Sequence, residues 1–122
     1  LKELELKNSK NFSKQKLKEE EGVLILKALK PSSKLISLDE KAKQFSSVEF
    51  ANMFEKFSLA GDSELTFVIG GAEGLSVEVL KKSALKISLG LMTYPHLMVR
   101  SILAEQIYRA FTIIEKHPYH RE

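Results

Sequence analysis

Cysteine is absent from this 122-residue chain, and proline occurs only three times. Without cysteine, the protein forms no disulfide, has no catalytic thiolate and lacks the ligands of the commonest zinc and iron–sulfur sites. Long hydrophobic runs are also missing, because charged residues interrupt every apolar stretch well short of the roughly 20 residues of a membrane-spanning helix. The sequence therefore argues against a membrane partner and is consistent with a cytoplasmic protein.

What the chain does have is the composition of one ordinary globular domain. It is 43% hydrophobic and 29% charged, and its length suits a single hydrophobic core. The net charge of +3 is a mild indication of an anionic partner, although a solvated surface with a small basic excess is the simpler explanation. Because the first residue is Leu1 and not methionine, we expect the sequence to lack an N-terminal segment.

Strand-like and helix-like segments alternate along the chain. Strands are expected where short runs are apolar or alternate with charges, around Leu4 and Leu6 and over residues 35–38, 65–69 and 85–89. Helices are expected where apolar residues recur every three or four positions, over 17–29, from a cap at Ser46 or Ser47, from about residue 76, and over 96–116. A polar loop is expected over 8–16. The 65–69 run is the clearest strand, and its composition predicts burial on both faces.

Alternating strands and helices imply right-handed crossovers and a parallel sheet with helices on both faces. The sequence therefore predicts one α/β domain, a parallel sheet flanked by helices. Within it, the expected helix over 96–116 is apolar on more than one face. Such a helix must be buried on several sides, so we expect a homodimer built on it.

Two glycine-bearing loops follow expected strands, at positions where parallel sheets bind ligands. These loops are Gly70–Leu75 and Gly90–Pro95. Because the carboxyl ends of parallel strands meet at one edge of the sheet, both loops are expected to border one cleft. The first loop matches neither the dinucleotide pattern G-x-G-x-x-G nor a phosphate-binding loop with its lysine, which favours a neutral or zwitterionic ligand over a polyphosphate. A plain strand-to-helix turn explains this loop equally well.

Few other side chains are spaced for chemistry. His117 and His120 lack a third metal ligand at useful spacing, so they are more simply surface residues or RNA contacts, and no metal is expected. Glu105 and Arg109 have the spacing of an ordinary intrahelical ion pair, with Tyr108 beside them.

Four segments together resemble the ribosomal RNA large subunit methyltransferase H family of the SPOUT superfamily. They read FVIGGAEGL, MTYPH, LAEQIYRA and HPYHRE, and they keep the family's order and spacing at Phe67–Leu75, Met92–His96, Leu103–Ala110 and His117–Glu122. Residues 17–29 and 35–41 fit the family only in pattern. The first strand and helix of family members have no counterpart here.

The resemblance implies an enzyme that uses S-adenosylmethionine to methylate N3 of pseudouridine 1915 in 23S rRNA, within an assembled ribosome or large subunit. It implies one SPOUT domain over residues 1–122, tied in a deep trefoil knot (an α/β knot), and an obligate homodimer. By the same resemblance, the cofactor is bound by residues of three loops, namely Leu38, Gly70, Gly71, Gly90, Leu91, Met92, Thr93, Tyr94 and Pro95.

The N3 atom of pseudouridine carries a proton, so the reaction must remove this proton or stabilise the anion that forms. The candidate catalytic residues are His96, Tyr119, His120 and Arg121, and the sequence leaves open which of them accepts the proton. Methyl transfer from a sulfonium is an in-line displacement, which needs positioning more than a metal.

Two other functions are alternatives. One is a catalytically silent knotted protein that binds RNA or ribosomes as an assembly factor. The other is a flavodoxin-like or receiver-like module for a small ligand, although only Asp39 and Glu40 approach the acidic cluster that a receiver needs. Binding of S-adenosylmethionine separates a methyltransferase from a flavin or phosphate binder.

Overall fold

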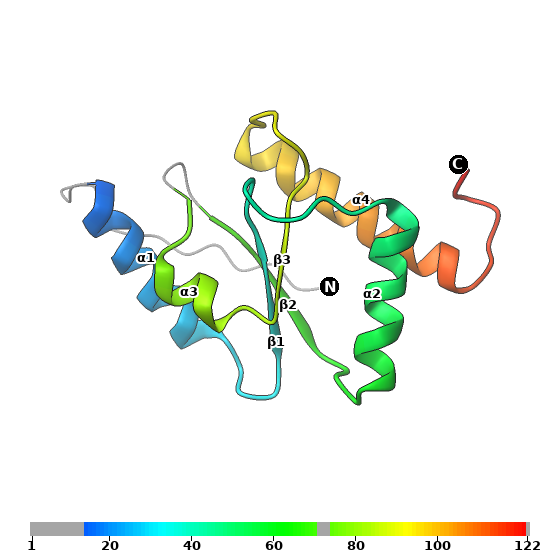
Figure 1. Ribbon diagram of the computed structural model, residues 1–122, viewed down its shortest axis with the longest axis horizontal. Coiled ribbons are helices and arrows are strands. Elements are labelled where there is room, and N and C mark those ends of the chain that lie inside the picture. Colours follow the sequence, from blue (N-terminus) through cyan, green and yellow to red (C-terminus); the bar gives the residue numbers. More distant parts are fainter. Residues whose placement is uncertain (1–13, 71–73, 122) are drawn as a thin grey trace.

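The computed structural model describes residues 14–70 and 74–121. Helices and strands alternate in the order α1 (Lys14–Ala28), β1 (Lys34–Leu38), α2 (Ser47–Leu59), β2 (Leu65–Ile69), α3 (Val77–Lys82), β3 (Leu85–Ile87) and α4 (His96–Ile114) (Figure 1). The strand expected around Leu4 and Leu6 lies outside the described residues. None of the helices in the described part is both long enough and apolar enough to cross a membrane.

β1 is the central strand of a parallel sheet whose order, among the described residues, is β2-β1-β3. Ile36 of β1 pairs with Phe67 of β2 and with Leu85 of β3. The predicted α/β fold with a parallel sheet is confirmed. Since the three strands point the same way, the loops that follow them leave the sheet at the same edge.

The prediction that residues 65–69 are buried on both faces is wrong. Only Val68 of β2 is buried, whereas β1 buries Leu35, Ile36 and Ser37. β2 lies at an edge of the described sheet and β1 at its centre, and burial follows this order. An apolar run predicts a strand but carries no information about which strands lie beside it.

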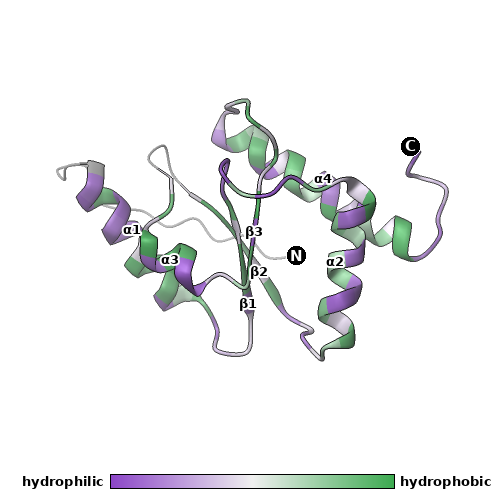
Figure 2. Cartoon of the chain, viewed as in Figure 1, coloured by the Kyte–Doolittle hydropathy of each residue, from purple (hydrophilic) through white to green (hydrophobic). Residues whose placement is uncertain are grey.

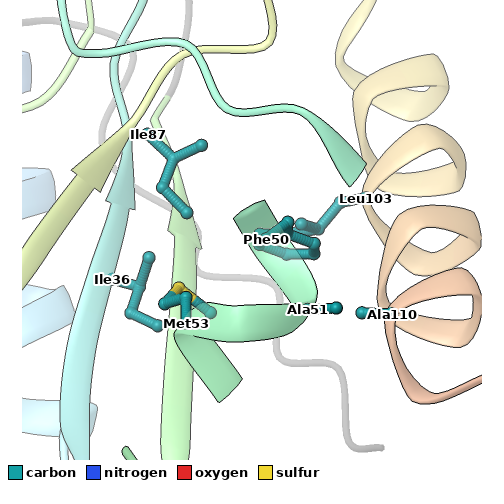
Figure 3. Packing of buried hydrophobic residues seen from close by; sticks show 7 residues of the cluster. All are labelled: Ile36, Phe50, Ala51, Met53, Ile87, Leu103 and Ala110. Carbon is teal, nitrogen blue, oxygen red and sulfur yellow. The ribbon is translucent and has the colours of Figure 1, made fainter. Parts of the chain in front are cut away.

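Helices cover both faces of the sheet, with α1 and α3 on one face and α2 and α4 on the other (Figure 1). Figure 2 shows apolar residues recurring along α2 and α4. In Figure 3, Ala51 of α2 faces Ala110 of α4, and both alanines are fully buried. Side chains this small let two helices approach closely, while Phe50 and Leu103 fill the space toward the sheet. The last helix is therefore held against α2 and the core.

Ser46 sets the start of α2 through a capping box. Its hydroxyl accepts a hydrogen bond from the Glu49 N–H at 3.1 Å, and the Glu49 carboxylate accepts one from the Ser46 N–H at 2.9 Å. The hydrogen bond from the Ser46 N–H lowers the pKa of the Glu49 carboxyl. Of the two caps that the sequence allowed, the structure uses Ser46. The cap fixes where the chain enters α2.

Some element boundaries differ from those expected. α1 begins at Lys14, inside the expected polar loop. The sequence pattern did not predict this first turn, because its residues are polar and show no apolar period. β3 ends at Ile87, and the next residue, Ser88, forms only a single bridge with Gln44. α4 ends at Ile114 because Lys116 has a φ of +58°, which a continuing helix does not allow.

Candidate functional site

A cavity of about 190 Å³ opens at the carboxyl ends of β1 and β3. It lies between these strand ends, the segment that leads into α2, and α4. Its lining contains apolar, hydroxyl and carboxamide side chains but no charged residue, and includes Leu38, Gln44, Ser47, Leu89, Leu103 and Gln106. Parallel sheets bind their ligands at this edge, so this cavity is the first candidate for a ligand site.

Ser47 and Gln106 join two walls of the cavity. The Ser47 hydroxyl donates to Gln106 Oε1 at 2.8 Å, which ties the start of α2 to α4. Since the carboxamide oxygen accepts this bond, the NH₂ group of Gln106 is the end left for a ligand. Sequence reasoning missed both residues, because the bond joins positions 59 residues apart that no local pattern connects.

The loop Gly90–Pro95 is anchored at its first residue. Gly90 has a φ of +121°, a conformation that residues with a side chain rarely adopt. Its N–H donates to Ser88 Oγ at 3.0 Å, and the Ser88 hydroxyl in turn donates to a carbonyl oxygen, that of Glu40, at 3.1 Å. Beyond this anchor, Leu91 is 83% and Met92 76% exposed. The loop thus presents apolar side chains to solvent.

The glycines after β2 have structural reasons of their own. A Cβ on Gly70 would lie 3.0 Å from the Gly74 carbonyl carbon and 3.0 Å from the Leu75 side chain, so a larger residue would force these atoms to move. Gly74 has a φ of +82°. Both requirements belong to the turn between β2 and α3, in keeping with the plain-turn interpretation. Gly71 lies outside the described residues.

Of the predicted cofactor residues that the structure describes, one lines the cavity and the others do not. Leu38 lines the cavity itself. Residues 90–95 follow the lining residue Leu89 and are not part of the lining. Gly70 lies just past the carboxyl end of β2, the strand that pairs with β1.

After α4 the chain reverses its direction at Lys116. The His117 N–H donates to the Thr112 carbonyl at 2.8 Å, and the Lys116 N–H donates to the Ile113 carbonyl at 3.1 Å. These bonds, with the positive φ of Lys116, form the Schellman pattern of a helix end. The tail turns back as a result (Figure 1), and its side chains reach residues of α4.

These contacts form a tail cluster, which consists of Glu105, Tyr108 and Arg109 of α4 with Tyr119 and His120 of the tail. Arg109 holds the Glu105 carboxylate at two points, with N–O distances of 2.7 and 3.2 Å. The Tyr119 hydroxyl donates to the same carboxylate at 2.8 Å, and Arg109 Nη1 lies 3.1 Å from His120 Nδ1. The guanidinium also lies over the Tyr119 ring, which meets Tyr108 edge to face. The predicted ion pair between Glu105 and Arg109 is confirmed, and the tail docks on it.

Hydrogen bonds inside the tail cluster fix its protonation states. The pKa of Glu105 is lowered, first by the hydrogen bond from Arg109 and then by that from Tyr119. The bond to Glu105 raises the pKa of Arg109 and the pKa of Tyr119. At neutral pH the cluster therefore holds a carboxylate, a guanidinium and a protonated phenol. Tyr119 is accordingly a hydrogen-bond donor in this arrangement.

The structure brings two of the predicted catalytic residues together and leaves one far from them. Tyr119 and His120 share the tail cluster, and Arg121 follows with an exposed side chain. His96 is exposed at the first position of α4, nine residues before Glu105, or about 14 Å along the helix axis.

The sequence predicted Arg109 only as the partner of Glu105 and not as a residue of the site. Its spacing from Glu105 indicated a plain ion pair, and its contacts with Tyr119 and His120 depend on the turn at Lys116, which no pattern in the sequence marks. Among the described residues, no group of three or more His, Asp or Glu is placed to hold a metal ion.

A parallel sheet with a cavity at its strand ends defines this chain as an α/β protein with a candidate ligand site at that edge. One family model, described as "Predicted SPOUT methyltransferase", matches residues 1–120. The chain belongs to the SPOUT methyltransferase family.

Curated relatives agree with this assignment. A protein from Parabacteroides distasonis is 49% identical over 118 residues, which cover 97% of this chain and 75% of the relative. A protein from Flavobacterium psychrophilum is 48% identical with the same coverage. One from Carboxydothermus hydrogenoformans is 52% identical over 107 residues, covering 88% of this chain and 67% of the relative. All three are named ribosomal RNA large subunit methyltransferase H, so the resemblance seen in four segments extends over most of the chain.

Proposed function

We propose that this protein is an S-adenosylmethionine-dependent methyltransferase that modifies N3 of pseudouridine 1915 in 23S rRNA, acting in the cytoplasm on assembled ribosomes or large subunits. The observation that carries the proposal is the similarity to relatives named for ribosomal RNA of the large subunit, at 49% identity over 97% of this chain. The net charge of +3 suits a polyanionic substrate.

The cavity at the strand ends suits S-adenosylmethionine by its chemistry. No charged residue lines it, so no cation repels the sulfonium. Leu38 and Leu103 offer apolar surface, and the NH₂ group of Gln106 is a donor for a polar group of the ligand. In this proposal Leu38, Gly70, Gly71 and residues 90–95 hold the cofactor, which supplies a methyl group bound to a positively charged sulfur.

The RNA side of the proposal rests on the tail and on His96. Tyr119 is 42% exposed and offers an aromatic ring on which a base can stack. Arg121 is an exposed cation suited to a phosphate. His120, beside them, and His96, at the start of α4, are the titratable groups of the proposed catalytic set. Tyr119, His120 and Arg121 would bind and orient the nucleotide that is methylated, and His96 would act from the start of α4.

We also propose that the protein is a homodimer whose chain is tied in the trefoil knot of its family. Leu97, Met98 and Phe111 of α4 are 71%, 50% and 47% exposed. Exposed apolar side chains on one helix are typical of a surface that a partner covers. Leu91 and Met92, in the loop before α4, are exposed apolar side chains as well. Sedimentation at low micromolar concentration tests the dimer, and a monomer would contradict it.

Two measurements test the enzymatic proposal. Calorimetry is expected to detect S-adenosylmethionine binding to the purified protein. Ribosomes that lack the modification are then expected to accept labelled methyl groups at N3 of the target pseudouridine. Ribosome binding without any methyl transfer would instead make the protein a silent assembly factor, and absence of cofactor binding would reject the proposal.

A further inference from the structure

The hydrogen bond between Arg109 and His120 decides which ring nitrogen of His120 carries a proton. Arg109 Nη1 lies 3.1 Å from His120 Nδ1. A guanidinium has donors and no acceptor, so Nδ1 must offer its lone pair. A neutral imidazole that accepts at one nitrogen carries its proton on the other. His120 in this arrangement is therefore neutral, with its proton on Nε2.

The second ring nitrogen is left without a partner. Nε2 of His120 is buried and has no hydrogen-bond partner among the described residues. A buried N–H without an acceptor costs free energy, and such groups need an explanation because the large majority of buried polar atoms are paired. An acceptor supplied by a ligand would satisfy this N–H once the groups that cover Nε2 shift aside on binding.

Arg109 cannot easily turn away from His120, because its guanidinium is held on its other side. Two N–H groups of Arg109 bind the Glu105 carboxylate, at 2.7 and 3.2 Å. The same guanidinium lies over the Tyr119 ring, 4.9 Å from its centre, and the Tyr119 hydroxyl binds Glu105 as well. In the described part of the chain, Glu105 and Arg109 of α4 and Tyr119 of the tail are charged or titratable groups near His120. Their contacts favour the same orientation of Arg109.

We propose that His120 donates a hydrogen bond through Nε2–H to a carbonyl oxygen of the target base, and that Glu105 and Arg109 are positioning residues that select this tautomer. The inference rests on the proposed function for the identity of the base. In a uracil ring, N3 lies between two carbonyl groups, and negative charge spreads to their oxygens when N3 loses its proton. A fixed N–H directed at one of these oxygens stabilises that charge.

The role of His120 in the reaction is then electrostatic. N3 would form a bond to the methyl carbon of S-adenosylmethionine, the carbon–sulfur bond would break with its electron pair kept by sulfur, and the N3 proton would leave to water. His120 keeps its own proton throughout. This assignment removes His120 from the candidates for the general base.

The tautomer is measured directly by long-range ¹H–¹⁵N correlation on protein labelled at histidine nitrogens. At neutral pH we expect an unprotonated Nδ1 and a protonated Nε2 for His120. In Arg109→Met the preference is expected to relax to the mixture of tautomers of an unrestrained imidazole, while Arg100→Met, an arginine replacement elsewhere on α4, leaves it unchanged. A proton on Nδ1 in the parent protein, or a cationic ring at neutral pH, would overturn the inference.

Methyl transfer separates a donor from a base. His120→Gln keeps a side-chain N–H but cannot accept a proton at neutral pH, whereas His120→Ala has neither function. We expect the Gln variant to stay within about ten-fold of the parent kcat with the same pH profile, and the Ala variant to lose about 10²–10³-fold. Equal losses in both, with the rising limb of the pH profile gone, would identify His120 as the base.

The two proposals fail in different ways. A parent protein that transfers no methyl group to ribosomes contradicts the proposed function. The nitrogen correlations need no substrate, so they support or overturn the assigned tautomer in either case.

Discussion

α4 contributes residues to both the cavity and the tail cluster, but the two sites differ in charge. Gln106 of α4 lines a cavity without a charged residue, while its neighbour Glu105 begins a network of carboxylate, guanidinium, phenol and imidazole. Successive residues of a helix point about 100° apart, so the two sites face different directions. An uncharged cavity selects its ligand by shape and a few hydrogen bonds, whereas a charged cluster acts on protons and phosphates. The two functions should therefore be separable by substitution.

Of the substitutions that test this comparison, Arg109→Ala is expected to have the largest effect on methyl transfer. It should disturb the tail cluster and leave the cavity unchanged. It removes the contacts that hold both Glu105 and His120. Displacement of the tail is expected to lower methyl transfer to ribosomes by about 10²-fold, while calorimetry shows S-adenosylmethionine affinity within two-fold of the parent. A loss of cofactor affinity comparable to the loss of transfer would mean that the two sites are one.

Gly90→Val tests the cavity and the loop beside it. At a φ of +121°, a side chain costs about 1–3 kcal/mol of backbone strain, and relief of that strain moves the loop beside the cavity. We expect S-adenosylmethionine to bind about ten-fold more weakly. Gly61→Val is the matched control, because Gly61 also has a positive φ, +87°, in open space but lies in the turn after α2. Equal loss of affinity in both variants would reduce the effect to general destabilisation.

Lys116→Gly tests how the turn at the end of α4 holds the tail. The positive φ of Lys116 favours glycine at this position of a helix end. The substitution is expected to stabilise the protein by about 0.5–1 kcal/mol, measured as a shift of the urea midpoint, with the tail still docked. A lower urea midpoint would instead show that contacts of the Lys116 side chain stabilise the protein by more than its positive φ destabilises it.

Low pH is expected to release the tail from α4 and to leave the cavity unchanged. The pKa of Glu105 is lowered by its bonds with Arg109 and Tyr119, so these bonds stabilise docking fully above the ordinary glutamate pKa of about 4.3. Docking is lost as the pH falls through the lowered pKa. Ring signals of Tyr119 in an NMR titration are expected to change as the pH falls below about 4. In Glu105→Gln this step should be absent, and release near pH 6 would point to a histidine instead.

The features predicted from sequence are those that local patterns encode. The strand at 65–69 and a helix cap at Ser46 or Ser47 each follow from residues within a few positions of one another. The edge of the sheet at which the loops lie follows from the alternation of strands and helices. The position of β2 at an edge of the described sheet was not predictable, because strand order is set by long-range pairing.

The candidate site was predicted only in part, for the same reason. The family resemblance predicted Leu38 as a cofactor contact, and Leu38 lines the cavity, but the bond between Ser47 and Gln106 joins distant segments. In the tail, a sequence can show that Glu105 and Arg109 pair on one helix. It cannot show that a lysine will adopt a left-handed conformation and return Tyr119 to them, because Lys116 is not a residue that favours this conformation.

The turn at Lys116 also makes the tail a separate unit of local unfolding. Its residues are held by side-chain contacts to one helix, so the tail can open while the sheet and its helices stay folded, at a free energy below that of global unfolding. The His117 amide hydrogen is bonded to the Thr112 carbonyl while the turn is closed, and it exchanges with solvent when the turn opens. Its exchange rate therefore measures the fraction of molecules with an open tail, and any ligand that binds the closed tail slows this exchange in proportion to its affinity and concentration.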